Sequence, residues 1–447
     1  MNSKLPDENY LGLVDILPSL DNCPRWQTHG KVVQLVGNLI EAEGMKATLG
    51  DICRINPSPG STPIYAEVIG FNQKRLKLSP LTSLSGIHPG CLVQAPHQAD
   101  CIPVSAAMLG RVLDGMGQPI DDGEPLPQGA LYPISGNLAN PLVRPVIKHQ
   151  LDVGIRCVNG LLPIGKGQRI GIFAGSGVGK STLLGMMARY TSASVNVIAL
   201  IGERGREVNE FLLNDLGEEG LKRSVVVVAT SDQPATVRLR GAFVACTIAE
   251  YFRDQGQDVL LMMDSLTRFA MAAREIGLAA GEPPTSKGYT PSVFSHMPRL
   301  LERAGNFEIA SVTGVYTVLV EGDDMEEPIA DASRSMLDGH IVLDRHLAQK
   351  RHFPAINVLR SVSRLTSRFQ SGEYGEFATK FIQTLAHYYN SEDMIRIGAY
   401  LRGTHAETDY AITMIDKLHD YLRQSVEESC SIAEAKTALA KLFAASQ

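Results

Sequence analysis

Residues 169–190, RIGIFAGSGVGKSTLLGMMARY, combine the residue types that bind phosphate. A short apolar run leads into a glycine-rich turn, and Lys180 and Ser181 open a helical pattern directly after it. Glycines let consecutive backbone N–H groups converge on phosphate oxygens, and the free N–H groups at the start of a helix attract the same anion. The lysine can reach the β- and γ-phosphates, and the serine hydroxyl can bind Mg²⁺. The pattern predicts an ATP site formed by Gly175, Ser176, Gly177, Val178, Gly179, Lys180, Ser181 and Thr182.

The turn departs from the strict phosphate-loop pattern at one position, where Ala174 stands in place of the first glycine. A methyl group is the smallest possible addition, and the strand, the loop, the Lys-Ser pair and the helix still follow in the required order. A dinucleotide-binding fingerprint is excluded, because GSGVGK lacks the G-x-G-x-x-G spacing. The next strand also ends without an acidic residue in a ribose-binding context.

Two acidic residues downstream follow apolar runs that are typical of buried strands. Asp264 ends the run in DVLLMMDSLTRFA, and a carboxylate there is predicted to bind Mg²⁺ together with Ser181. Glu203 closes the strand in LIGERGREVNEF and is predicted to orient or activate the attacking water. Parallel strands present their carboxyl ends at one edge, so these residues should meet Lys180 there. Glu207 and Glu210 lie a helical turn or more further on and are expected to point elsewhere.

The elements that must position these residues alternate along the middle of the chain. Short apolar runs rich in Ile and Val alternate with helical patterns such as residues 236–255, which predicts an α/β fold with parallel strands covered by helices. The predicted strands are residues 169–173, 195–201, 224–229, 259–263, 310–320 and 340–343.

Four segments are predicted from the changes in composition. Residues 1–29 form an N-terminal arm, with Tyr10, Leu13, Val14 and Leu17 on one helical face that either docks on the chain itself or binds a partner or membrane surface. Residues 30–96 have short β-rich pieces, typical of a small β-barrel or meander. Residues 97–364 form the ATPase domain, entered through a Gly/Pro/Asp-rich linker at 109–129, and residues 365–447 are helical.

Composition narrows the class of protein further. The chain has 447 residues and a net charge of −6, which gives no reason to expect nucleic acid as a partner. The longest apolar runs are too short to span a bilayer, and the N-terminus lacks a signal-peptide pattern, so a cytoplasmic location is expected. Seven dispersed cysteines indicate reduced thiols rather than disulfides or a zinc site.

Several longer motifs resemble the ATPases of type III protein export, found in the bacterial flagellum and in virulence injectisomes. The resemblance is carried by GERGREV, DSLTRFAMAAREIGLAAGEPPTSKGYTPSVF, YTVLVEGDDMEEPIADASRSMLDGHIVLDR and FPAINVLRSVSR. That family is itself similar to the catalytic subunit of rotary F/V-type ATPases. The resemblance implies an N-terminal β-barrel, a RecA-like core and a C-terminal helical domain, assembled as a ring, typically a homohexamer, with ATP between subunits.

The resemblance also implies roles for single residues. Glu203 polarises the attacking water, the adjacent Arg204 helps to hold the site, and Arg268 lies just beyond Asp264. Arg364 matches the arginine finger that reaches a neighbour's nucleotide, whereas Arg368 lacks the motif. Phe353 matches an aromatic that packs on adenine, with a core phenylalanine as the alternative. Residues 281–292 match a loop that faces the ring channel, with a plain solvated loop as the alternative.

The expected partners follow from the resemblance alone: a stalk protein in the channel, a negative regulator at the N-terminal arm, and chaperone–substrate complexes, at the cytoplasmic face of a membrane export gate. The flagellar version is favoured over the injectisome version on FPAINVLRSVSR and TSKGY. A rotary ATPase subunit, a Rho-like nucleic-acid translocase and a non-catalytic ring subunit are the rival interpretations. The barrel region has few aromatics and no basic cluster, which disfavours the translocase.

Overall fold

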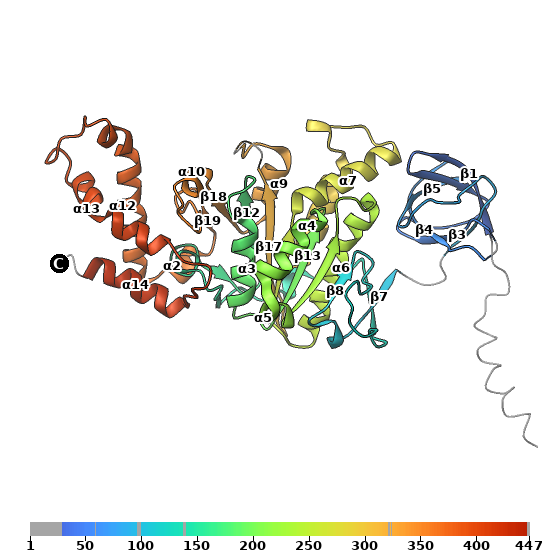
Figure 1. The fold of residues 1–447 in the computed structure, drawn as a ribbon, viewed down its shortest axis with the longest axis horizontal. Coiled ribbons are helices and arrows are strands. Elements are labelled where there is room, and N and C mark those ends of the chain that lie inside the picture. Colours follow the sequence, from blue (N-terminus) through green and yellow to red (C-terminus); the bar gives the residue numbers. More distant parts are fainter. Residues whose placement is uncertain are drawn as a thin grey trace, which may run out of the picture. The chain divides into compact units, whose positions relative to one another are not determined.

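A computed structural model describes residues 29–58, 60–95, 100–136, 140–320, 322 and 324–444. The chain divides into two compact units at residues 99 and 100 (Figure 1). The helical face expected in the N-terminal arm lies outside the described residues.

The first unit is a closed six-stranded barrel, as the β-rich texture of residues 30–96 predicts. The strands are β1 (His29–Val36), β2 (Leu39–Glu43), β3 (Ile52–Asn56), β4 (Ile64–Asn72), β5 (Arg75–Pro80) and β6 (Leu92–Gln94), in the order β1-β2-β5-β4-β3-β6. Alternate residues of the longer strands are buried, which fills the interior with apolar side chains such as Ile40, Ile55 and Leu78. The sequence pieces anticipated four of these strands and missed β3 and β6, of five and three residues.

The second unit is built on a mixed, mainly parallel sheet. Its strands are β8 (Val112–Asp114), β12 (Arg169–Ala174), β13 (Val195–Ile201), β14 (Ser224–Ala229), β15 (Val259–Asp264), β16 (Gly305–Asn306), β17 (Ser311–Leu319), β18 (Gly339–Leu343) and β19 (Val362–Ser363). The order is β19-β18-β12-β17-β15-β13-β14-β8, with β16 and β19 antiparallel to their neighbours. Every predicted strand of this sheet is confirmed to within one residue at each end.

The prediction of a linker at residues 109–129 is partly wrong. Its residues 112–114 form β8, an edge strand parallel to β14. The following turn folds back because the Asp121 carboxylate accepts hydrogen bonds from the Arg111 guanidinium and the Val112 N–H. Glycine and proline around so short a strand concealed it in the sequence. On either side, β7 (Cys101–Val104) pairs with β9 (Ala130–Pro133).

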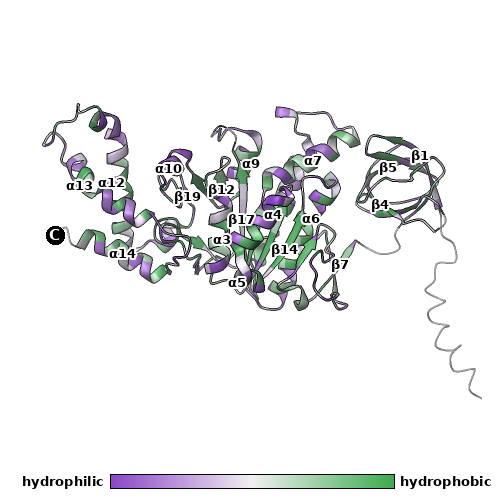
Figure 2. Cartoon of the chain, viewed as in Figure 1, coloured by the Kyte–Doolittle hydropathy of each residue, from purple (hydrophilic) through white to green (hydrophobic). Residues whose placement is uncertain are grey.

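Helices cover the sheet and connect its strands. They are α2 (Arg156–Leu161), α3 (Lys180–Tyr190), α4 (Gly205–Glu210), α5 (Gly217–Lys222), α6 (Ala235–Asp254), α7 (Leu266–Ala280), α8 (Pro291–Leu301), α9 (Pro328–Met336) and α10 (Arg345–Gln349). A π-helical turn, η3 (Phe211–Leu216), joins α4 to α5, and short 3₁₀ turns are η1 (Ala106–Met108), η2 (Pro141–Val143) and η4 (Ser286–Gly288). A small hairpin pairs β10 (Gln150–Leu151) with β11 (Ile164–Gly165). Figure 2 shows the strands of the sheet as the apolar interior between these helices.

The C-terminal part is helical, as predicted, with α11 (Thr366–Phe369), α12 (Gly372–Arg396), α13 (Ala406–Leu422) and α14 (Ile432–Ala444). It continues the core of the ATPase domain, since α14 packs on α2 and Phe381, Leu418 and Leu439 belong to the same buried cluster as Leu161. The boundary at residue 365 therefore stays a prediction. No helix among the described residues is long and apolar enough to cross a membrane.

Candidate active site

The phosphate loop connects β12 to α3 with the geometry that its glycines allow. Gly177 and Gly179 have φ angles of 75° and 89°, in the left-handed region that L side chains rarely adopt. Ala174 is still the last residue of β12, paired in register with Leu319 and Leu343 and fully buried. A regular strand position accepts a Cβ atom, which explains why a glycine is not required there.

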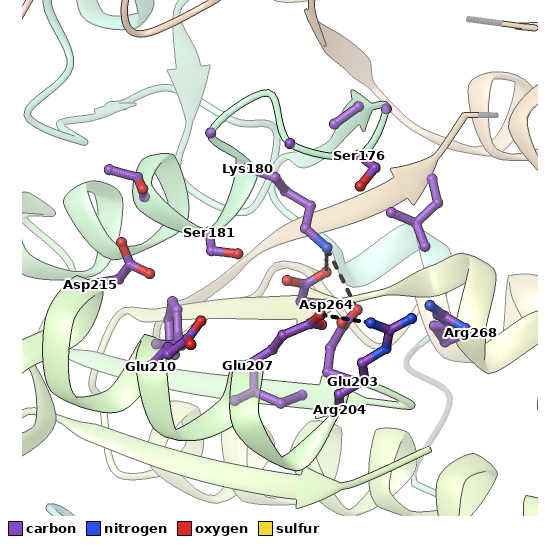
Figure 3. A pocket seen from close by; sticks show the side chains of 18 of the residues that line it. Ser176, Lys180, Ser181, Glu203, Arg204, Glu207, Glu210, Asp215, Asp264 and Arg268 are labelled. Atoms are coloured by element: carbon purple, nitrogen blue, oxygen red, sulfur yellow. Dashed lines mark hydrogen bonds and ion pairs between the residues drawn. The ribbon is translucent and has the colours of Figure 1, made fainter. Parts of the chain in front are cut away.

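A cleft of about 620 Å³ lies in front of this loop, at the carboxyl edge of the sheet (Figure 3). Lys180 at the start of α3, Asp264 at the end of β15 and Glu203 two residues beyond β13 converge in it. The Lys180 Nζ atom lies 2.5 Å from Asp264 Oδ1 and 3.6 Å from Glu203 Oε1. The structure thus brings together three residues that lie far apart in the sequence, and their chemical roles stay predictions.

Burial and neighbouring charges determine the protonation states of Lys180 and Glu203. Burial raises the pKa of Glu203 to about 7, the nearby Lys180 ammonium opposes that rise, and the Asp264 carboxylate adds to it. Burial lowers the pKa of Lys180, but the two carboxylates outweigh it, so the net shift is upward. Lys180 therefore stays protonated at neutral pH, whereas Glu203 can gain or lose its proton there.

The expectation that Glu207 and Glu210 point elsewhere is wrong, because both line the cleft. The chain turns at Gly202 (φ 72°), and α4 starts at Gly205, directly beside the sheet edge. Residues three apart share one face of a helix, so positions 207 and 210 both face the cleft. The Glu207 carboxylate lies 3.9 Å from the Arg204 guanidinium, and Figure 3 marks this ion pair with a dashed line. Glu207 also helps to raise the pKa of Glu203.

The remaining predicted residues of this edge also lie at the cleft. Ser176, Ser181 and Thr182 line it from the loop and the first turn of α3, while Val178 is buried behind them. Arg204 lines it with a largely exposed side chain, and Arg268 lines it from α7. By contrast, Arg206 is exposed outside the lining and lies 3.5 Å from Glu210.

The predicted arginine finger lies outside the cleft of its own chain. Arg364 follows the edge strand β19, and its exposed guanidinium has no hydrogen bond or ion pair to any residue that the structure describes. Arg368 instead donates to the Ile147 carbonyl within the chain. Its role as an arginine finger for a neighbouring subunit stays a prediction.

Phe353 is placed beside the phosphate loop and is not a core residue. It is 44% exposed, and a Cβ atom at Gly179 would lie 3.6 Å from its ring. The exposed ring can therefore stack on a base whose phosphates occupy the loop. This geometry removes the core alternative and leaves adenine stacking as a prediction.

Three further residues of the site had no clear signal in the sequence. The Thr317 hydroxyl on β17 donates to Asp264 Oδ1 at 2.7 Å, because β17 lies between β12 and β15. Asp215 on η3 and Arg345 on α10 line the cleft. Only the order of the strands in the sheet could have identified Thr317, and that order cannot be read from one amino-acid sequence.

The loop at residues 281–292 forms η4 and the first turn of α8. Lys287 is exposed at its tip, and its ammonium lies 3.2 Å from the Asp324 carboxylate. Its place facing a ring channel stays a prediction.

Comparison with known proteins places this site in a family. The family model for the "ATP synthase alpha/beta family, nucleotide-binding domain" matches residues 154–363, and the model for the "T3SS EscN ATPase C-terminal domain" matches residues 371–441. The chain is 52% identical over 433 residues to a "Flagellum-specific ATP synthase" of Bacillus subtilis, covering 96% of this chain and 98% of the relative. The chain belongs to the type III protein export ATPases.

Other comparisons agree with this membership. A "Type 3 secretion system ATPase" of Xanthomonas euvesicatoria is 47% identical, with 90% of each chain covered. The assembled ATPase EscN of the enteropathogenic E. coli type III secretion system has a TM-score of 0.88 at 45% identity, covering 92% of this chain and 99% of EscN. The structure of EscN with its central stalk EscO gives a TM-score of 0.85 at the same identity. The predicted family and fold are confirmed, and the C-terminal match separates this export ATPase from rotary subunits.

Proposed function

We propose that this export ATPase hydrolyses Mg²⁺-ATP at the interfaces of a homohexameric ring and drives protein export by the flagellar apparatus. The observation that carries the proposal is the convergence of Lys180, Glu203 and Asp264 in one cleft, with Arg364 held free outside it. The cleft supplies the side chains that bind phosphate and orient water. Arg364 supplies the additional cation that the site of a neighbouring subunit lacks.

Nucleotide binding requires an exchange of partners at Lys180. Its ammonium is held by Asp264 at 2.5 Å and lies near Glu203. The β- and γ-phosphates offer the lysine a stronger anionic partner, next to the converging N–H groups of the loop. Lys180 and the loop then hold the phosphates, while Phe353 stacks on the adenine.

The residues at the metal position fit Mg²⁺. The Asp264 carboxylate and the Ser181 hydroxyl are hard oxygen donors in the same cleft, and the Lys180 ammonium already lies against Asp264 as a cation. Bound there, Mg²⁺ would neutralise charge on the phosphates and orient them. Thr317, which donates to the same carboxylate, fixes its orientation.

Glu203 is the residue that orients the attacking water. It is buried, it lies at the phosphate end of the cleft, and its raised pKa makes it a better proton acceptor than an exposed carboxylate. Arg364 of the next subunit neutralises the charge that develops on the transferred phosphate, a contribution of about 10³–10⁵ in turnover for arginine fingers.

The flagellar assignment and the partners rest on relatives. Three flagellum-specific relatives are 50–52% identical to the chain, above the injectisome ATPase at 47%, and four further flagellum-specific relatives are 44–46% identical. EscN is assembled and binds its stalk EscO. We therefore propose a stalk protein in the ring channel, a regulator at the N-terminal arm and chaperone–substrate complexes as partners. The ring acts in the cytoplasm at the membrane export gate, and nucleic acid is not an expected partner.

The test of this function is ATPase activity of the purified chain over a wide range of protein concentration, with oligomer mass measured in parallel. Turnover per chain should rise steeply as the ring assembles, because Arg364 completes the site of a neighbour. A turnover that is constant from monomer to oligomer would contradict sites shared between subunits. Whether the flagellar or the injectisome system uses the chain is tested by deleting its gene and scoring motility and effector secretion.

A further inference from the structure

Arg345 is a cation of the cleft that neither the sequence nor the family comparison assigns to a role. It is the first residue of α10, its side chain is exposed, and it lines the cleft together with the phosphate loop. It has no hydrogen bond or ion pair from its guanidinium to any residue in the described part of the chain.

The backbone fixes Arg345 beside the phosphate loop. Strand β18 runs parallel to β12, with Leu343 in register with Ala174. Arg345 follows the end of β18 by two residues, as Ser176 follows the end of β12, and both line the cleft. Asp344 stabilises the turn between β18 and α10, because its carboxylate accepts hydrogen bonds from the His346 N–H at 2.7 Å and from the Asn357 side-chain amide at 2.8 Å.

The other cations of the cleft lie on the side of its acids. Lys180 is paired with Asp264, and Arg204 lies 3.9 Å from Glu207. Arg268 has no ion pair among the described residues, but it lies on α7, which begins two residues after Asp264. Arg345 alone lies on the opposite side of β12 from these acids, since the strand order is β18-β12-β17-β15-β13. A guanidinium without an acidic partner, beside a phosphate-binding turn, matches a phosphate oxygen in geometry and charge.

We propose that Arg345 is a nucleotide-binding residue that contacts the phosphate chain of ATP from the β18 side of the phosphate loop. The inference rests on the proposed function of the cleft as the ATP site. Arg345 would then be a second cationic side chain, besides Lys180, that one subunit contributes to its own ATP site. The proposed role of Arg364 in the site of a neighbouring subunit is unchanged.

Binding of fluorescent mant-ATP with excess Mg²⁺ to the full chain tests the proposal. Arg345→Ala should weaken binding about 10-fold, the lower end for a charge-assisted hydrogen bond because the side chain is exposed. Arg345→Lys should recover part of the affinity. Binding by Arg345→Ala should also depend less on salt concentration than binding by the wild type, because one ion pair to phosphate is lost.

Arg206→Ala is the matched control, since it removes an exposed arginine of α4 whose side chain lies outside the cleft. If Arg345→Ala binds within twofold of this control while Lys180→Ala loses binding, the inference is overturned and the ATP site stands. If Lys180→Ala binds like the wild type, the proposed function itself fails. A lower melting temperature of Arg345→Ala without nucleotide, with no recovery of affinity in Arg345→Lys, would assign Arg345 a structural role instead.

Discussion

Replacing Glu203 with glutamine should separate catalysis from binding and stabilise the chain at the same time. The carboxylate is buried beside Asp264, and its pKa is raised from 4.5 to about 7. A raised carboxyl pKa means that the folded chain holds the proton more tightly than the unfolded chain. The ionised form therefore costs stability, and this cost is absent below pH 4.5 and complete above pH 7.

The size of this cost follows from the shift. Between pH 4.5 and 7 this cost grows to about 3 kcal/mol at most, a value that already includes the opposing effect of the Lys180 ammonium. Glu203→Gln removes the charge but keeps the shape of the side chain. At pH 8 without nucleotide, the variant should unfold at higher denaturant concentration than the wild type, and at pH 4 the two should nearly coincide.

The same variant should bind mant-ATP with wild-type affinity and lose about 10²–10⁴ in turnover, the range for a general base. Wild-type turnover should also fall as the pH drops below 7 in the concentration range where the ring is assembled. Glu210→Gln is the control, because Glu210 lines the cleft with a 58% exposed side chain and should change neither property. Equal stability of wild type and Glu203→Gln at pH 8 would refute the burial argument, and near-normal turnover would refute the catalytic role.

Three other substitutions address the remaining parts of the site. Lys180→Ala should lose ATP binding and turnover together, measured by mant-ATP titration and phosphate release, because its ammonium is the central cation of the cleft. Arg364→Ala should keep binding and lose about 10³-fold in turnover at concentrations where the ring is assembled, and unchanged activity there would exclude a finger. Phe353→Ala should weaken ATP binding about 5- to 10-fold, the value of one lost stacking contact of about 1–1.5 kcal/mol, but leave inhibition by inorganic triphosphate unchanged.

The strands of the ATPase sheet could be predicted because physical constraints on them are strong and local. A parallel strand buried on both faces must be a continuous apolar run, so residues 195–201 and 224–229 were found with their observed ends. Strand β8 was missed because three residues among glycines and prolines carry no pattern. Its pairing with β14 depends on tertiary structure alone.

Some residues of the candidate site could likewise be predicted from the sequence, and others could not. Lys180, Glu203 and Asp264 end or follow strands whose carboxyl ends share an edge, so their meeting could be inferred from the order of elements. The places of Glu207 and Glu210 could not, because they depend on the direction in which α4 leaves the sheet. That direction is set at Gly202, where a Cβ atom would lie 2.8 Å from the Cβ atom of Arg268. Such a close approach exists only in the folded chain.

The charge of the cleft supports the proposed assembly into a ring. Five carboxylates and four cationic side chains line it: Glu203, Glu207, Glu210, Asp215 and Asp264 against Lys180, Arg204, Arg268 and Arg345. A single chain therefore offers a polyanionic nucleotide a site with no excess of positive charge. The proposed Mg²⁺ would compensate part of the deficit in the ground state. In the proposed ring, the guanidinium of Arg364 supplies the further cation that the charge developing during transfer needs, and this would couple assembly to catalysis through electrostatics.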